Sequence, residues 1–355
     1  MGKVLMKGNE AIAEAAIRAG CLNYFGYPIT PQNEVAEYLS RRLPEVGGVF
    51  LQGESEIAVS YMVFGAAACG ARVFTTSSSP GISLMSEAIS YIAAAQCPAV
   101  FVNIMRGGPG LGGILPSQAD YFQATKGGGH GDYRLFVMAP AGVQEVVEMV
   151  MMAFPIAEKY RNPVMILGDG LIGQMMEPVE FPEHLKSEPS NKDAWATNGM
   201  DARGSKQRNL VRTLFLDPDE LERNNLTLKA KYEQMAREDI RFVPYNTESE
   251  YQILIVSYGT MSRVVQTAID GLKTRGIQVG LIRPQTLFPF PEKAIYEAAS
   301  KESCRIVFSI ELSMGQMVED VDRSVRGRRP VRWYGKSGGD VPTPEEIMDL
   351  IQSAI

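Results

Sequence analysis

The feature that most constrains the fold is the alternation of short apolar runs with longer helical segments through the first half of the chain. Each run is too short for a core helix and is apolar throughout, as expected for a strand buried in a parallel sheet. We expect strands at residues 22–25, 49–51, 72–75, 99–105, 135–138 and 164–167. Helical segments separate them at residues 11–19, 31–42, 56–69, 81–95 and 143–160. This order predicts an α/β fold in which helices cover both faces of a parallel sheet.

A second, smaller α/β domain is expected in residues 251–355, where the alternation resumes. Its strands are predicted at 253–257, 278–282 and 305–310, and its helices at 261–274, 291–300 and 344–354. A chain of 355 residues has room for two such units. Residues 181–250 lie between the two predicted domains, 1–180 and 251–355, and are rich in proline and charge. They contain one exposed helix at 217–239, which indicates a connector, or an arm packed across a neighbour.

Composition excludes several classes of protein. The net charge of −6 and the pI near 5.3 argue against nucleic acid and anionic membrane surfaces as partners. The longest apolar runs, such as 93–105, are interrupted by Gln96 and Pro98 and are too short to span a bilayer. The N-terminus shows no pattern typical of a signal peptide. We therefore expect a cytoplasmic protein.

Cysteine and histidine are too sparse for several kinds of site. The four cysteines are far apart, which excludes an iron–sulfur or CxxC pattern within this chain: Cys21, Cys69, Cys97 and Cys304. Each lies in an apolar segment, so we interpret all four as buried, reduced thiols. With two histidines in the chain, a histidine-rich metal site or a Ser-His-Asp triad has little support. Any proton chemistry is expected to involve a carboxylate.

Thr30 is the first candidate functional residue, because ligands of open parallel sheets bind at the carboxyl ends of strands. It follows an expected strand and lies between Pro28 and Pro31, which restrict the backbone on both sides. The stiff turn presents one hydroxyl ahead of a helix expected to begin at Pro31. The simpler interpretation is that Thr30 only caps that helix.

Glu54 and Glu56 follow the next expected strand and open a helix that is apolar nearly all round, which predicts a buried helix. Residues two apart on a helix do not share a face, so the two carboxylates are expected to point differently. A carboxylate at the mouth of a buried helix is suited to exchanging a proton with a buried heterocycle. The alternative is an acidic first-turn residue that only complements the helix dipole.

Arg106 directly follows the expected strand 99–105 and precedes a glycine-rich stretch too small to cover it. An arginine there can present its planar fork to a substrate carboxylate. The alternative is an ion pair at the surface or between subunits.

Two motifs are set aside. Residues 108–113 match GxGxxG, but Ile114-Leu115-Pro116 follows where a dinucleotide site needs a helix, so we interpret the stretch as a flexible active-site loop. Gly168-Asp169-Gly170 with Asn198 is similar to the magnesium and diphosphate motif of thiamine-diphosphate enzymes. No strand leads into Asn198, so a turn after a strand is the better interpretation.

The chain resembles the α subunit of the 2-oxoacid:ferredoxin oxidoreductases, over almost its whole length. It is most similar to the branched-chain (2-oxoisovalerate) type, with the 2-oxoglutarate type next. The resemblance is carried by Gly8-Asn9-Glu10-Ala11, Tyr27-Pro28-Ile29-Thr30-Pro31, Glu54-Ser55-Glu56-Ile57-Ala58, Ser79-Pro80-Gly81, Ser83-Leu84-Met85, Arg106-Gly107-Gly108-Pro109, Glu311-Leu312 and Gly315-Gln316.

The resemblance implies a fold and a set of site residues. Residues 1–180 would be the pyrimidine-binding domain of a thiamine-diphosphate enzyme, and 251–355 would resemble the C-terminal domain of transketolase. Glu56 would contact the cofactor's aminopyrimidine N1′, with Tyr27, Pro28 and Ile29 also at the cofactor. Thr30 and Arg106 would bind the 2-oxoacid and, with Glu56, form the catalytic set.

The implied reaction is oxidative decarboxylation of a 2-oxoacid with coenzyme A, giving acyl-CoA, CO2 and reduced ferredoxin. The implied partners are a β subunit that binds the cofactor's diphosphate, a γ subunit, and a ferredoxin-like iron–sulfur subunit or ferredoxin. Mg2+ and 4Fe–4S clusters would belong to those partners. Two alternatives stay open: a self-sufficient thiamine-diphosphate decarboxylase or transketolase-type enzyme, and a non-catalytic α/β scaffold.

The substrate side chain is not fixed by the residues. No second strand-end Arg or Lys is dedicated to a distal carboxylate, which favours an apolar acid, although Lys126 or Arg134 can serve that purpose.

Overall fold

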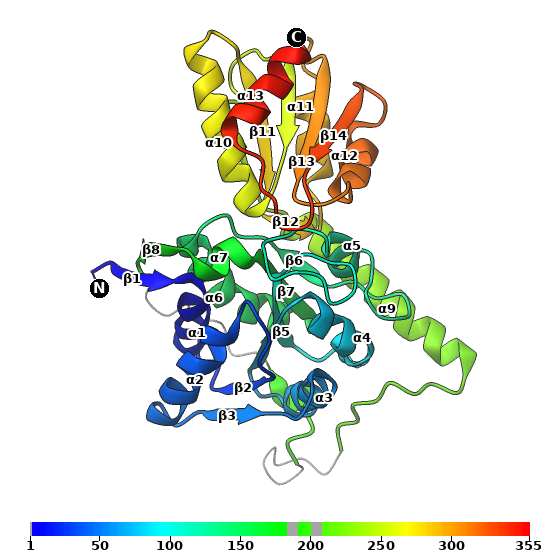
Figure 1. Ribbon diagram of the computed structural model, residues 1–355. Coiled ribbons are helices and arrows are strands. Elements are labelled where there is room, and N and C mark those ends of the chain that lie inside the picture. The colour runs from blue at the N-terminus through cyan, green and yellow to red at the C-terminus, as the bar shows by residue number, and fades with distance from the viewer. Residues whose placement is uncertain (1, 183–190, 200–207) are drawn as a thin grey trace.

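The computed structural model describes residues 2–182, 191–199 and 208–355 and shows two α/β bodies, one above the other (Figure 1). The larger body contains a seven-stranded sheet of order β12-β6-β7-β5-β4-β2-β3, parallel except at the β12–β6 edge. Its strands are β2 (Asn23–Gly26), β3 (Val49–Gln52), β4 (Val73–Ser77), β5 (Ala99–Met105), β6 (Phe136–Met138), β7 (Pro163–Asp169) and β12 (Thr286–Phe288).

Helices cover both faces of this sheet, as the sequence predicted. Alternate residues of β5 point to opposite sides, so Val100 and Val102 join one apolar cluster whereas Phe101 and Met105 join another. The first cluster packs under α1 (Gly8–Arg18), α2 (Asn33–Glu45) and α6 (Val143–Tyr160); the second packs under α3 (Glu56–Ala68) and α4 (Ser79–Ala94).

The smaller body contains a five-stranded sheet of order β14-β13-β10-β11-β9, parallel except at the β11–β9 edge. Its strands are β9 (Phe242–Tyr245), β10 (Ile253–Val256), β11 (Val279–Pro284), β13 (Ile306–Glu311) and β14 (Val331–Gly335). Its helices are α10 (Gly259–Thr274), α11 (Glu292–Ala299), α12 (Met317–Val325) and α13 (Pro344–Ser353). The predicted fold class, a larger and a smaller α/β unit with parallel-rich sheets, is confirmed.

The remaining elements are short or peripheral. β1 (Val4–Lys7) and β8 (Met176–Val179) form an antiparallel pair beside the larger sheet, and α5 (Tyr121–Thr125), α7 (Gly170–Gln174) and the 3-10 turn η1 (Lys192–Ala194) lie in connections. The predicted exposed helix is α9 (Pro218–Glu238), which runs along the outside of the larger body (Figure 1). It is exposed over most of its length and buries Leu228, Tyr232 and Met235 against that body. No helix in the described residues is long and apolar enough to cross a membrane.

Three local predictions were wrong. The helix expected at Pro31 begins at Asn33 with Gln32 as its N-cap, so Thr30 lies in a turn and does not cap a helix. Helix α3 is only partly buried, because none of the described residues forms a layer over its outer face, and Ile57 is 46% exposed. Cys69 is exposed because it ends α3 at the surface, whereas the other three cysteines are buried. Burial raises the pKa of the Cys21 and Cys97 thiols to about 12.

Candidate functional site

The carboxyl ends of neighbouring strands place the predicted residues around one edge of the larger sheet. Residues 27–30 follow β2, Glu56 follows β3, Ser79 follows β4 and Arg106 follows β5. These strands are adjacent and parallel, so their ends meet at the same edge. The prediction that these segments come together is confirmed for Thr30 and Arg106, because Arg106 Nη1 donates to the Thr30 carbonyl at 3.0 Å.

Arg106 is buried, with 7% of its surface exposed, and its surroundings correct the expectation that the glycine-rich loop leaves it open. The loop folds back, pairing Arg106 with Pro116, and Arg106 Nη2 donates to the Leu111 carbonyl at 3.2 Å. Positive φ angles at Gly110 and Gly112 make this reversal possible. Arg106 Nε has no hydrogen-bond partner, and no ion pair of Arg106 occurs among the described residues. The fork is therefore held by two backbone carbonyls, with its charge unpaired by any carboxylate in that part of the chain.

Glu56 is also 7% exposed and begins α3, whose N-cap Ser55 accepts a hydrogen bond from Ala58 N. Glu54 is exposed, so the prediction that the two carboxylates point differently is confirmed. The Glu56 carboxylate has neither a hydrogen-bond nor an ion-pair partner within the described ranges. A Cβ added at Gly81 would lie 2.1 Å from Ser77 Oγ and 2.9 Å from Glu56 Oε1, so a glycine is needed where the first turn of α4 approaches the Glu56 carboxylate. The buried Ser77 hydroxyl, close to the same position, has no partner either.

Two hollows flank the loop that covers Arg106. One, of about 590 Å³, is lined by Thr30, Ile114, Leu115 and Leu171 together with polar residues of α2 and the N-terminus. The other, of about 750 Å³, is lined by residues 107–110 of the loop and by residues of both bodies. Thr30 and Pro28 are exposed, whereas Tyr27 and Ile29 are half-buried. Glu56 lies in the wall of neither hollow.

Asp120 is a site neighbour that sequence reasoning missed. Its Oδ2 accepts hydrogen bonds from Ser79 Oγ at 2.6 Å and from Asn103 Nδ2 at 2.9 Å. Burial raises the pKa of the Asp120 carboxyl. The one available signal was Asn103, an amide inside an otherwise apolar strand that must find a polar partner when buried.

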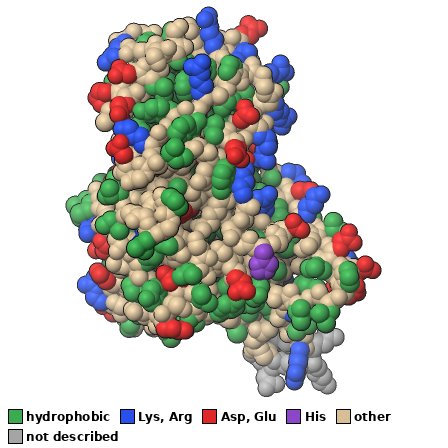
Figure 2. Space-filling view, turned by 45° about the vertical axis from the view of Figure 1, so that its right-hand side comes forward, with side chains coloured by type: hydrophobic (Ala, Val, Ile, Leu, Met, Phe, Trp, Pro, Cys, Tyr) green, Lys and Arg blue, Asp and Glu red, His purple; other side chains and the backbone are tan. Residues whose placement is uncertain are grey.

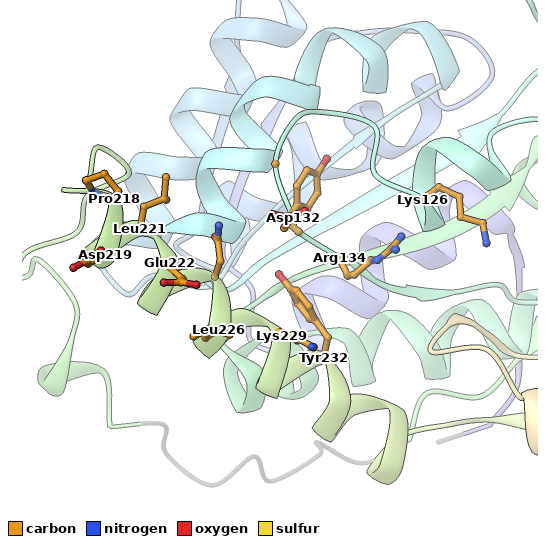
Figure 3. A pocket seen from close by; sticks show the side chains of 13 residues that line it. Lys126, Asp132, Arg134, Pro218, Asp219, Leu221, Glu222, Leu226, Lys229 and Tyr232 are labelled. Carbon is orange, nitrogen blue, oxygen red and sulfur yellow. The ribbon is translucent and has the colours of Figure 1, made fainter. Parts of the chain in front are cut away.

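A larger hollow, of about 810 Å³, lies between α9 and the loop that carries Asp132 and Arg134 (Figure 3). Lys126 and Arg134 both line it, and neither lines the hollow at Thr30. Lys126 pairs with Asp320 at 2.5 Å, and Arg134 donates to the Thr125 carbonyl at 2.7 Å. The suggestion that one of them binds a distal substrate carboxylate beside Thr30 is therefore wrong.

The two motifs set aside have structural roles. Asp169 caps α7 by accepting hydrogen bonds from Leu171 N and Ile172 N, and it also accepts one from Thr260. Asn198 donates a hydrogen bond to Asp193 at 2.9 Å, and Asp193 lies in η1 and not in residues 168–170. Residues 168–170 thus form the junction between β7 and α7, where Asp169 caps a helix instead of lying in the expected turn. Within residues 2–182, 191–199 and 208–355, no group of three or more His, Cys, Asp or Glu side chains is placed to hold a metal ion.

Family models match both parts of the chain. Residues 14–234 match the family described as pyruvate flavodoxin/ferredoxin oxidoreductase, thiamine diP-bdg, and residues 252–347 match pyruvate:ferredoxin oxidoreductase core domain II. The chain belongs to this oxidoreductase family. The resemblance inferred from the sequence is thereby confirmed.

Curated relatives and solved structures agree with this assignment. The chain is 46% identical to the ketoisovalerate oxidoreductase subunit VorB of Methanothermobacter thermautotrophicus, over 99% of this chain and 98% of the relative. It is 36% identical to the 2-oxoglutarate synthase subunit KorA of the same organism, over 98% of this chain and 97% of the relative. The 2-oxoglutarate:ferredoxin oxidoreductase of Magnetococcus marinus superposes with a TM-score of 0.84 at 26% identity, and this chain spans 65% of that protein's chain. A split-gene transketolase, at 14% identity and a TM-score of 0.62, shares the fold.

The residues of this oxidoreductase chain fit the pyrimidine end of thiamine diphosphate. A buried carboxylate that has no partner among the described residues is suited to a hydrogen bond with a heterocyclic nitrogen. The unpartnered Ser77 hydroxyl adds a second polar group at the same place.

On the face drawn in Figure 2, positive and negative side chains are interspersed over both bodies.

Proposed function

We propose that this chain is the α subunit of a thiamine-diphosphate-dependent 2-oxoacid:ferredoxin oxidoreductase acting on 2-oxoisovalerate and related branched-chain acids. The products are acyl-CoA, CO2 and reduced ferredoxin, with coenzyme A as the acyl acceptor. The observation that carries the proposal is the 46% identity, along the full length, to a ketoisovalerate oxidoreductase subunit. Two further observations within the described residues support it: Glu56 has no hydrogen-bond partner, and Arg106, which lies at the same edge of the sheet, has no ion-pair partner.

Glu56 is the proton-handling residue in this proposal. Its carboxyl group would donate a hydrogen bond to the aminopyrimidine N1′ and, after giving up its proton to that atom, would accept a hydrogen bond from N1′–H. When bound, thiamine diphosphate supplies the nucleophilic carbon and the electron sink for decarboxylation. Tyr27, Pro28 and Ile29 line the cofactor from the end of β2, where two of them are already half-buried.

Thr30 and Arg106 bind the substrate's 2-oxo and carboxylate oxygens. Arg106 is buried without a carboxylate partner, and a buried charge is costly unless it is paired. A 2-oxoacid carboxylate supplies the missing negative charge, and the planar guanidinium suits a carboxylate. Arg106 Nε is a buried donor without a partner, and a substrate oxygen would satisfy it.

The hollow beside Thr30 supports a branched aliphatic side chain. Ile114, Leu115 and Leu171 contribute apolar surface to it, and all three are exposed enough to be covered by a ligand. Lys7 is the cation in its wall, and its Nζ forms an ion pair with Glu34 Oε1 at 3.6 Å. A second carboxylate, as in 2-oxoglutarate, has no free cation among the described residues of this wall. The 36% identity to a 2-oxoglutarate synthase subunit keeps 2-oxoglutarate as the second candidate substrate.

Partner subunits complete the proposed enzyme. A β subunit would bind the diphosphate and Mg2+, and a γ subunit and a ferredoxin-like subunit or ferredoxin would complete the assembly, with 4Fe–4S clusters in the partners. Exposed apolar side chains lie on two helices that pack against each other near Glu56: Ile57 and Tyr61 on α3, and Leu84 on α4. Exposed apolar groups are typical of interaction surfaces. Glu56 lies in neither hollow of this chain, which supports a cofactor site closed by another subunit.

The division of the chain belongs to the same proposal. Residues 1–180 would form the pyrimidine-binding domain, 181–250 the connector and 251–355 the transketolase C-terminal-like domain. The reaction would take place in the cytoplasm, as composition led us to expect.

The test is purification of the chain with its native partners, followed by a ferredoxin- or viologen-linked assay with coenzyme A and a panel of 2-oxoacids. We expect the highest kcat/KM with 2-oxoisovalerate. Preference for 2-oxoglutarate would retain the mechanism and replace the substrate. Cofactor and magnesium binding by the isolated chain would favour a self-sufficient enzyme, and no activity with any 2-oxoacid in the intact complex would contradict the proposal.

A further inference from the structure

Residues 117–126, which we call the bridge segment, connect the smaller body to the candidate site. Gln118 Nε2 donates to the Tyr258 carbonyl and Gln118 Oε1 accepts from Leu312 N, each at 2.9 Å. Tyr121 donates to Asp320 Oδ2 at 2.6 Å, and Lys126 pairs with the other oxygen of Asp320. The bridge segment is therefore fixed to the smaller body at both of its ends.

Asp120 lies in the middle of the bridge segment and contacts the larger body. Its Oδ2 accepts from Ser79 Oγ on the first turn of α4 and from Asn103 Nδ2 on β5. No lysine or arginine in the described part of the chain forms an ion pair with Asp120. Asp120 is half-buried in the wall of the 750 Å³ hollow, so the hydrogen bonds from Ser79 and Asn103, rather than an ion pair, hold its carboxylate in place.

Ser79 connects Asp120 to Arg106 through hydrogen bonds. The Ser79 hydroxyl has one proton, which it donates to Asp120 at 2.6 Å, and its oxygen accepts from Arg106 N at 3.0 Å. Ser79 N in turn donates to Asn103 Oδ1 at 3.1 Å. The backbone of Arg106 is thus held by the hydroxyl that Asp120 orients.

The same turn of α4 also borders Glu56. Gly81 lies two residues after Ser79, and a Cβ at Gly81 would be within 2.9 Å of Glu56 Oε1. A shift of this turn therefore changes the position of Arg106 and the space beside Glu56 together. Displacements of about 1 Å at a reacting group cost up to roughly 100-fold in rate.

We propose that Asp120 is a positioning residue of the site: through Ser79 it fixes the first turn of α4 and Arg106 relative to Glu56, and it joins their placement to the docking of the smaller body. This inference rests on the proposed 2-oxoacid chemistry. Asp120 itself contacts neither substrate nor cofactor in this arrangement.

The experiment compares Asp120→Ala, Asp120→Asn and the control Asp132→Ala in the purified complex with its partner subunits. Asp132 is an exposed aspartate of a nearby loop that lines a different hollow. We expect Asp120→Ala to raise KM for the 2-oxoacid about tenfold, with a smaller fall in kcat, because Arg106 binds the carboxylate. Asp120→Asn retains an oxygen that accepts both hydrogen bonds and should stay within about threefold of the parent. Asp132→Ala should be unchanged.

A double-mutant cycle tests whether Asp120 acts through Ser79. If it does, Ser79→Ala should reproduce the KM increase, and the Asp120→Ala/Ser79→Ala pair should be no worse than either single change. Multiplicative effects, or an unchanged KM in Asp120→Ala, would overturn the inference. If Asp120→Ala does not assemble, the comparison of Asp120→Asn with Ser79→Ala decides the question: normal KM in Ser79→Ala contradicts it.

Failure of this inference is distinguishable from failure of the proposed function. Glu56→Gln and Arg106→Ala are assayed in the same complex. If both lose turnover while Asp120→Ala behaves like the parent, only the positioning role is wrong. If Glu56→Gln keeps full turnover, the proton-handling role of Glu56 is wrong, and if the parent complex turns over no 2-oxoacid, the proposed function itself is wrong.

Discussion

Glu56 and Glu311 occupy equivalent places in the two bodies but have opposite surroundings. Each is a buried glutamate at the carboxyl end of a parallel strand and beside a helix N-terminus. Glu311 is fully buried and accepts five hydrogen bonds, from the hydroxyls of Ser309 and Ser313 and from the three backbone N–H groups of residues 316–318. Glu56 has no such partner in the described chain.

The difference separates structure from function at one kind of position. A carboxylate whose lone pairs are all used serves to hold a helix in place, because every donor around it depends on it. A buried carboxylate with unused lone pairs is costly to the folded chain, and it is retained where a ligand supplies the donor. The hydrogen bonds of the two carboxylates, rather than residue type or fold position, are the basis on which we propose Glu56 as the functional member of the pair.

The largest expected effect is the loss of activity on changing Glu56. Glu56→Gln or Glu56→Ala should lower turnover by about 10²–10⁴-fold, the range for a proton-transfer group, and should leave folding and assembly intact. A ferredoxin- or viologen-linked assay with a size measurement of the complex checks both parts. Near-normal turnover in Glu56→Ala would erase the distinction between the two glutamates.

The reciprocal change is Glu311→Ala, which should act on stability. It leaves five donors without their acceptor, and we expect unfolding free energy to fall by about 3 kcal/mol or more. Urea denaturation of the isolated chain measures it. A Glu311→Ala chain as stable as the parent would show that the five hydrogen bonds to Glu311 do not stabilise the fold.

Gly81→Ala sharpens the description of Glu56. A methyl group at Gly81 lies within 2.9 Å of Glu56 Oε1 and fills the space beside the carboxylate. We expect turnover to fall about tenfold, through displacement at the reacting group. Stability should also fall, by about 1–3 kcal/mol, because the methyl group would lie 2.1 Å from the buried Ser77 Oγ and the better helix propensity of alanine offsets only part of this crowding. Steady-state kinetics and thermal melting distinguish the two effects, and full activity in this variant would place the cofactor elsewhere.

The smallest effect concerns a buried charge away from the strand ends. Lys231 on α9 donates to the Arg161 carbonyl at 3.1 Å, and burial, with the nearby Arg161 charge, lowers its pKa from 10.5 to about 7. Because the unfolded chain binds this proton more tightly than the folded one, stability should rise with pH between about 7 and 10.5. Lys231→Met should lack this contribution to the rise and be about 1 kcal/mol more stable at pH 7.

Denaturant midpoints at pH 7, 8 and 9 measure the Lys231 effect, with exposed Lys229→Met as the matched control. Turnover of the Lys231→Met complex should equal that of the parent. A loss of turnover would show that an incompletely compensated buried charge on α9 also has a function, and would weaken the rule drawn from Glu56.

Much of the fold was predictable because fully buried parallel strands have continuous apolar runs in their sequence. The strand at Ala99–Met105 and the helix at Val143–Tyr160 have the predicted bounds, and most other elements differ by one or two residues. The missed strands are short ones at sheet edges, such as Val331–Gly335, whose arginine and exposed tryptophan give no apolar run. Edge strands depend on their neighbours more than on their own composition.

The site was predictable only in outline. The strand-end rule selected Thr30, Glu56 and Arg106 because their places follow from local pattern and parallel topology. Which of these groups has partners depends on contacts far apart in sequence, such as the Leu111 carbonyl folding back on Arg106. Asp120 was missed for the same reason, since its partners lie 17 and 41 residues away.

Strand β12 has a consequence for any attempt to divide this protein. It comes from the later part of the chain yet forms the border of the larger sheet against β6. A fragment ending before Thr286 would leave the backbone of β6 open to pairing with other chains, and a fragment starting at residue 251 would carry a strand without its sheet. Either half expressed alone is therefore expected to aggregate. Separate genes for the two halves would need another segment to pair with the free edge of β6.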